Sequence, residues 1–138
     1  DFAVDLLHVK HVIVVGHHGC SGVRMALRRS AGGLAEHWLR HLQDVQARHA
    51  ALVDSVTGAD DKVNLLAELN VLDQASNVCE STIVREAWGQ HADLTVSGWI
   101  YSLRDGLLID LGFNVDARTD LDAARASALK FIKSRYGR

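Results

Sequence analysis

The chain has 138 residues, is 48% hydrophobic and carries a formal net charge of -2 at pH 7. This length suits one domain with its own hydrophobic core, so we expect a single domain over residues 1–138. A weakly acidic chain lacks the basic footprint of a nucleic-acid-binding protein, and no apolar run in it is long enough to span a membrane. We therefore expect neither a nucleic acid nor a membrane as a partner.

The first residues carry apolar side chains at Phe2, Val4 and Leu6, which predicts the end of an amphipathic helix. His8 and His11 follow and are interpreted as a polar entrance to the next strand. His11 is not expected to share a metal with His17, because six residues of extended chain span roughly 20 Å.

Residues 12–23 are the centre of the predicted fold. The β-branched run at residues 12–15 indicates a buried strand, and glycines, histidines and a cysteine follow it directly. An open α/β sheet places its chemistry at this end of a strand. Ser21 is expected to cap the helix that comes next.

His17 and Cys20 are three residues apart across the glycine-containing turn, and both are zinc-ligand types. The spacing lets both side chains face one point, and a helix N-terminus or a bound metal would favour the Cys20 thiolate. The alternative is a packed cysteine beside an exposed histidine. His18 is expected to point away from the ligand position or to line the mouth of the site.

Two helices are predicted next. Residues 24–29 form a short helix with three arginines, interpreted as a solvated face rather than an anion site, and Gly32 and Gly33 end it. Apolar residues then recur at helical spacing over residues 34–52, at Leu34, Trp38, Leu42, Val45 and Leu52. The histidines of this helix, His37, His41 and His49, are interpreted as a surface stripe in preference to a metal-binding ladder.

A second long helix is predicted over residues 62–77, with Glu68, Asn70 and Gln74 as its polar positions. Cys79 follows and is interpreted as a buried structural thiol, since it has no histidine partner nearby in sequence. Ser81 is expected to cap a short helix over residues 81–88.

The remaining segments predict a hairpin and a closing helix. Residues 94–101 and 107–111 are the two strands, joined by a turn at residues 104–106, and residues 120–136 are helical. The predicted fold class is α/β, with a parallel strand core, helices on its faces and an added antiparallel hairpin. Such a partial sheet leaves an edge and a face uncovered, which dimerisation or a companion segment would cover.

The stretch GHHGCSGV at residues 16–23 resembles the Gly-His-x-x-Cys-Gly-Gly-Val segment of the β-class carbonic anhydrases. Three further blocks resemble that family in the same order: GL with WLRHLQDV at residues 33–45, ELNV with Q, NV and TIV at residues 68–84, and GWIY with DGLL at residues 98–108. Ser97 stands where the family more often has histidine. Several separate blocks in order make the resemblance specific.

The resemblance implies a zinc enzyme that hydrates carbon dioxide reversibly to bicarbonate and a proton. It assigns His17 and Cys20 as two zinc ligands. The family's other cysteine and an aspartate lie in an upstream Cys-x-Asp-Ser-Arg motif, which has no counterpart here. We therefore expect the C-terminal portion of a longer enzyme, with the zinc site only half encoded in this chain. No further catalytic residue is identified.

Tyr101 matches a tyrosine that helps to hold bicarbonate at a non-catalytic site in one subgroup of the family. The alternative is a packed hairpin tyrosine with a solvated hydroxyl. From the family we also expect a homodimer or homotetramer. The two cysteines, Cys20 and Cys79, form no disulfide framework, which favours a reducing, cytoplasmic location.

Two other functions stay open. The chain is alternatively a catalytically inactive, truncated carbonic anhydrase-like module for dimerisation or regulation. A third hypothesis is a different metal or anion site that uses His17, His18 and Cys20 with a ligand from a partner chain.

Overall fold

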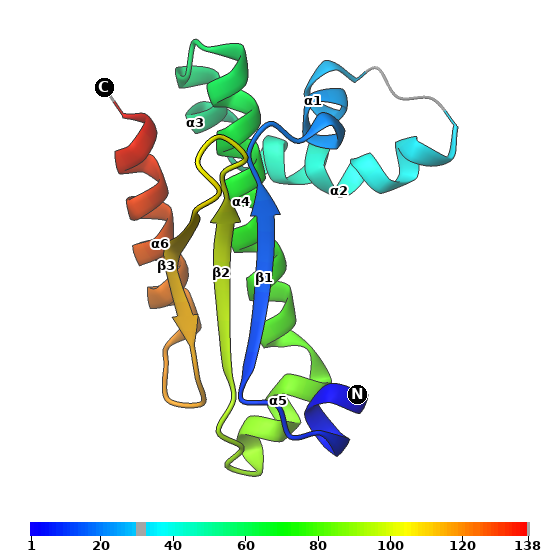
Figure 1. Cartoon of the computed structure of the whole chain (residues 1–138), viewed down its shortest axis with the longest axis vertical. Helices are drawn as coiled ribbons and strands as arrows, with labels where there is room; N and C mark the ends of the chain where they lie inside the picture. The colour runs from blue at the N-terminus through cyan, green and yellow to red at the C-terminus, as the bar shows by residue number, and fades with distance from the viewer. Residues whose placement is uncertain (30–32, 138) are drawn as a thin grey trace.

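The computed structural model describes residues 1–29 and 33–137 (Figure 1). In chain order its elements are a π-helical turn η1 (Phe2–Leu6), β1 (His11–His17), α1 (Ser21–Arg28), α2 (Leu34–Arg48), α3 (Ala50–Ser55), α4 (Ala59–Glu80), α5 (Thr82–Gly89), β2 (Thr95–Tyr101), β3 (Leu108–Val115) and α6 (Leu121–Tyr136). None of the described helices combines the length and the hydropathy needed to cross a membrane.

The three strands form one mixed sheet in the order β1-β2-β3. β1 and β2 are parallel and in register from His11 opposite Thr95 to His17 opposite Tyr101. β2 and β3 are antiparallel, with a register shift at Gly98 and Trp99. The predicted α/β fold with a parallel pair and an added antiparallel hairpin is therefore confirmed.

Helices α4 and α6 cover one face of the sheet (Figure 1). α4 lies so close to it that a Cβ atom at Gly16 would be 2.6 Å from Val71 Cγ2, and one at Gly98 would be 3.2 Å from Val71 Cγ1. Only glycine leaves room for the helix at these two positions. The core between helix and strands includes Leu66, Leu69, Ile100, Leu111 and Phe113, all fully buried.

The opposite face of the sheet is open along β1, which is also an edge strand among the described residues. Exposure alternates along this strand, as a strand covered on one side requires. Ile13 and Val15 lie on the open side and are 41% and 51% exposed. The uncovered edge and face that the sequence predicts are present in the described part of the chain.

The helix predicted over residues 34–52 is two helices, because the backbone leaves helical geometry at His49, with φ -115° and ψ 24°. Trp38 was expected to face the core but is 83% exposed, since the first turns of α2 project away from the sheet and from α4 (Figure 1). The predicted helix break at Gly32 and the side chain of Leu34 lie outside the described residues.

The structure corrects two predictions about helix boundaries, the Ser81 cap and the end of α4. Ser81 precedes α5, but its hydroxyl donates to the Val78 carbonyl at 2.7 Å and caps nothing in α5. α4 extends through Cys79 to Glu80, so the predicted end at residue 77 is too early. Asp120, the residue before α6, caps this helix, because its Oδ1 accepts a hydrogen bond from Ala123 N at 2.8 Å.

Candidate metal centre

A tight turn connects the carboxyl end of β1 to α1. β1 ends at His17, and Cys20 is the N-cap of α1, with extended dihedrals of φ -61° and ψ 120°. Ser21 is therefore the first helical residue, and the prediction that it caps the helix is wrong. Gly19 has φ +68°, the left-handed region that glycine adopts without strain. His17 and Cys20 thus flank the turn, as the sequence predicts.

The imidazole of His17 is oriented by its own turn. His17 Nδ1 lies 3.0 Å from the carbonyl oxygen of His18. A carbonyl oxygen only accepts hydrogen bonds, so Nδ1 carries the proton and Nε2 keeps its lone pair. Metal-binding histidines commonly hold their second nitrogen in this way. The exposed His17 side chain is therefore prepared to bind a metal through Nε2.

The two cysteines differ in environment. Cys20 is a half-buried free thiol at the N-terminus of α1. Cys79 is fully buried in the last turn of α4, and burial together with the charge of Glu80 raises the pKa of its thiol to about 11. Cys79 is the structural thiol that the sequence predicts, and Cys20 is the candidate ligand.

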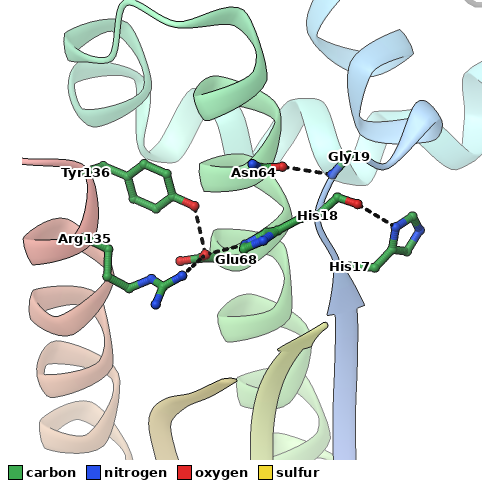
Figure 2. Close-up of polar contacts among 7 residues, drawn as sticks. All are labelled: His17, His18, Gly19, Asn64, Glu68, Arg135 and Tyr136. Atoms are coloured by element: carbon green, nitrogen blue, oxygen red, sulfur yellow. Dashed lines mark hydrogen bonds and ion pairs between the residues drawn. The ribbon is translucent and has the colours of Figure 1, made fainter. Parts of the chain in front are cut away.

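His18 points away from His17 and into the protein, as Figure 2 shows. Its Nε2 lies 2.8 Å from Glu68 Oε1, and its backbone N–H donates to the Tyr101 carbonyl at 2.9 Å. The next amide, Gly19 N, donates to Asn64 Oδ1 at 2.8 Å. Asn64 and Glu68 are four residues apart and share one face of α4, so two side chains of this helix fix the position of the turn.

Glu68 is fully buried, and three donors converge on its Oε1 (Figure 2). Besides His18 these are Arg135 Nη2 at 3.1 Å and Tyr136 OH at 2.8 Å. Burial and the Glu68 charge raise the pKa of Tyr136 far above its usual value, so its hydroxyl stays protonated and donates. Glu68, one of the polar positions of the predicted helix, is therefore buried, and its donors come from inside the fold.

Comparison with known proteins identifies the family. A family model described as carbonic anhydrase matches residues 1–108. This chain belongs to the carbonic anhydrase family. A carbonic anhydrase of Emericella nidulans is 36% identical over 116 residues, covering 84% of this chain and 50% of that protein. One from Synechococcus elongatus is 30% identical over 128 residues, covering 88% of this chain and 46% of that protein.

Solved structures identify the β class of carbonic anhydrases. The Coccomyxa β-carbonic anhydrase in complex with acetazolamide superposes with a TM-score of 0.79 at 31% identity, covering 88% of this chain and 59% of that one. A β-carbonic anhydrase of Aspergillus fumigatus gives 0.76 at 35% identity, covering 94% and 60%. The chain thus spans about half the length of the curated carbonic anhydrases that it matches.

Among residues 1–29 and 33–137, no three histidine, cysteine or acidic side chains are grouped closely enough to hold a metal ion. His8 and His11 lie before and at the far end of β1 from His17. His37 and His41 are exposed on α2, and His49 Nε2 lies 3.9 Å from Asp73 Oδ1. The described part of this carbonic anhydrase chain therefore offers no metal site of its own beyond the two candidate ligands that flank the turn.

Tyr101 is the register partner of His17 in the neighbouring parallel strand. Paired residues of adjacent strands lie on the same face of a sheet, so both side chains belong to the open face. Tyr101 is half-buried, and its carbonyl accepts the His18 N–H. Its role in bicarbonate binding stays a prediction.

Sequence reasoning missed the residues that hold the turn, namely Asn64, Glu68, Arg135 and Tyr136. A usable signal was present for one of them. Glu68 stands inside the apolar run Leu65, Leu66, Ala67 and Leu69, where a carboxylate is buried only if it is partnered. The partners themselves are 67 and 68 residues away in the chain, and no local pattern connects them.

Proposed function

We propose that this chain is part of a zinc-dependent carbonic anhydrase that converts carbon dioxide reversibly to bicarbonate and a proton. His17 and Cys20 supply two of the zinc ligands. One observation carries the proposal: in a chain of this family, the turn after β1 presents an imidazole whose Nε2 is free and, three residues later, a free thiol.

The donor set fits zinc, which binds imidazole nitrogen and thiolate sulfur. Because the described residues bring only two such groups together, the remaining ligands come from outside them. When bound, zinc supplies the Lewis acidity that activates water near neutral pH. A zinc site with only two of its ligands in this chain is consistent with a chain that spans about half the length of its relatives.

The other residues of the turn orient the ligands. The His18 carbonyl fixes the His17 ring by accepting its Nδ1–H, and Cys20 is held in place as the N-cap of α1. Tyr101 is proposed to contact bicarbonate, because its hydroxyl can donate to an anion and it stands beside His17 on the same sheet face.

We further propose that the protein is a homodimer or homotetramer. The exposed Ile13 and Val15 beside the unpaired edge of β1 support self-association, since an apolar edge strand invites pairing. Two tetrameric β-carbonic anhydrases are known from Sordaria macrospora, one of which resembles this chain with a TM-score of 0.78 at 31% identity. The superposed part covers 83% of this chain and 58% of the Sordaria chain.

A reducing, cytoplasmic location is also proposed. Both described cysteines are free thiols, and Cys20 must stay reduced to bind zinc. Fluorescence microscopy of the tagged protein in its source cells tests this location.

The test of the function is elemental analysis of the purified protein that contains this chain, together with carbon dioxide hydration by stopped flow. We expect about one zinc ion per chain, lost in Cys20→Ser and retained in Cys79→Ser, the matched thiol control. A well-folded protein that contains no zinc and has no hydration activity contradicts the proposal. That result favours the alternative, a non-catalytic module for dimerisation or regulation.

A further inference from the structure

The hydrogen-bond network beneath the metal-binding turn reaches the last turn of α6. Arg135 and Tyr136 contribute two of the three donors to Glu68 Oε1, and both come from this turn. The segment matched by the carbonic anhydrase family model ends at residue 108, before α6 begins at Leu121. These two contacts therefore come from a part of the chain that the family model does not describe.

The network is sensitive to the loss of any donor. Glu68 is fully buried, and its second oxygen, Oε2, has no hydrogen-bond partner among the described residues. The side-chain hydrogen bonds that Glu68 makes with the described residues therefore all go to Oε1. Arg135 provides the compensating charge at 3.1 Å, and its side chain is only 26% exposed. A buried carboxylate that loses a donor or its counter-charge is strongly destabilised, which favours a rearrangement of its side chain towards other polar groups.

His18 transmits such a shift to His17. The side chain of His18 is held by Glu68, and its carbonyl oxygen accepts the proton of His17 Nδ1 (Figure 2). The residue that contacts the buried carboxylate is therefore the same residue that orients the candidate zinc ligand. A movement of His18 that displaces its carbonyl oxygen would therefore change the direction in which His17 Nε2 points.

We propose that Arg135 and Tyr136, acting through the buried carboxylate of Glu68, position His18 and thereby the imidazole of His17 for metal binding. They are positioning residues, because they contact neither the metal ligands nor substrate. The inference rests on the proposed role of His17 as a zinc ligand. It makes the end of α6 a determinant of metal affinity and of ligand geometry.

The experiment compares Tyr136→Phe and Arg135→Met with the unmodified protein. Zinc affinity is measured by competition with a chromophoric chelator, and ligand geometry by the visible absorption of the Co²⁺-substituted protein. We expect both variants to bind zinc more weakly, by up to about 10-fold, because a direct outer partner of a metal ligand is worth 10-fold or more and these residues act on His17 indirectly. The cobalt absorption bands are expected to shift in position or intensity.

Arg125→Met is the matched control. Arg125 lies on the same helix, and its Nη2 is 3.6 Å from Oδ1 of Asp73, a second buried carboxylate on α4. This variant removes a guanidinium that forms an ion pair with a buried carboxylate away from the turn. We expect its zinc affinity and cobalt spectrum to equal those of the unmodified protein, whatever its stability.

Unchanged zinc affinity and cobalt spectrum in Tyr136→Phe and Arg135→Met overturn the inference, and so does an equal loss of affinity in Arg125→Met. If Arg135→Met fails to fold, Tyr136→Phe decides, because it removes a single oxygen atom. Zinc that is lost in Cys20→Ser but bound normally by the Tyr136 and Arg135 variants refutes this inference alone. No zinc in the unmodified protein refutes the proposed function and the inference together.

Discussion

Asp73 is a buried acid on α4 whose charge is balanced from the side of α2 and α6. Arg48 donates to its Oδ2, His49 Nε2 lies 3.9 Å from its Oδ1 and Arg125 Nη2 lies 3.6 Å from the same oxygen. Burial alone would raise the pKa of Asp73. The nearby imidazole of His49, together with the hydrogen bond and the charge of Arg48, outweighs burial and holds the pKa below its usual value. Asp73 is therefore ionised in the folded protein at neutral pH.

Asp73→Asn is expected to lower the free energy of unfolding at pH 7 by about 1–3 kcal/mol, the range for a hydrogen bond to a charged group. A carboxyl whose pKa is lowered on folding stabilises the fold above its unfolded pKa, near 4, and loses this contribution as the pH falls through its folded pKa. The difference between the two proteins should therefore shrink below about pH 4. Urea unfolding from pH 7 to pH 3 measures it, and a difference independent of pH contradicts the assignment.

At the scale of elements, the fold depends on how closely α4 approaches the two parallel strands. Val71 is the point of contact, since its two methyl groups lie against Gly16 on β1 and Gly98 on β2. His17 directly follows Gly16, so the packing of α4 also determines where β1 delivers the candidate ligand. Neither strand can move towards the helix, and neither position accepts a Cβ without movement of the helix.

Gly16→Ala is expected to destabilise the protein by about 1–3 kcal/mol, because the new methyl group overlaps Val71 Cγ2. Val71→Ala in the same chain should recover part of the loss by removing that methyl group. Gly89→Ala is the control, since a Cβ there meets nothing within 4 Å. Thermal unfolding of the unmodified protein, of Gly16→Ala and Val71→Ala alone and of the double variant gives the coupling energy, and strictly additive effects would show that the two residues do not compete for space.

At the scale of the whole molecule, the two faces of the sheet are unequal. α4 and α6 cover one face, whereas β1 leaves Ile13 and Val15 exposed to solvent on the other. Exposed apolar side chains next to an unpaired edge are typical of an interface rather than of a free surface.

Val15→Lys should shift the protein towards monomers, because a lysine on an edge strand must be desolvated when a second copy covers it. Sedimentation velocity over a range of concentrations measures the shift. Lys130→Glu is the control, as it changes an exposed charge on α6, on the other side of the sheet. Equal sedimentation of Val15→Lys and the unmodified protein would mean that the open face takes no part in assembly.

The sequence predicts the elements well where one local pattern determines them. The β-branched run before Gly16, the hairpin at residues 94–111 and the closing helix are all confirmed, because strand alternation and capping are local properties. The break at His49 and the exposure of Trp38 were not predictable, since both depend on where α4 stops supporting α2.

The residues of the candidate site likewise include some that a local pattern predicts and some that it does not. His17 and Cys20 are recognisable because they stand three residues apart in the sequence, and in the structure they lie on either side of one turn. Their supports are not recognisable, because Glu68 meets Arg135 and Tyr136 only after α6 has packed against α4. Tertiary packing brings these three side chains together, and no periodicity in the sequence records it.

The projecting part of α2 has an optical consequence. Of the three tryptophans, Trp38 is 83% exposed, whereas Trp88 and Trp99 are half-buried, with Trp88 Nε1 donating to the Leu94 carbonyl. An indole in water emits at longer wavelength than one in an apolar environment, so the red edge of the emission spectrum belongs to Trp38. A blue shift of that edge on concentration, accompanied by loss of iodide quenching, would report without any attached dye that another surface has come to cover α2.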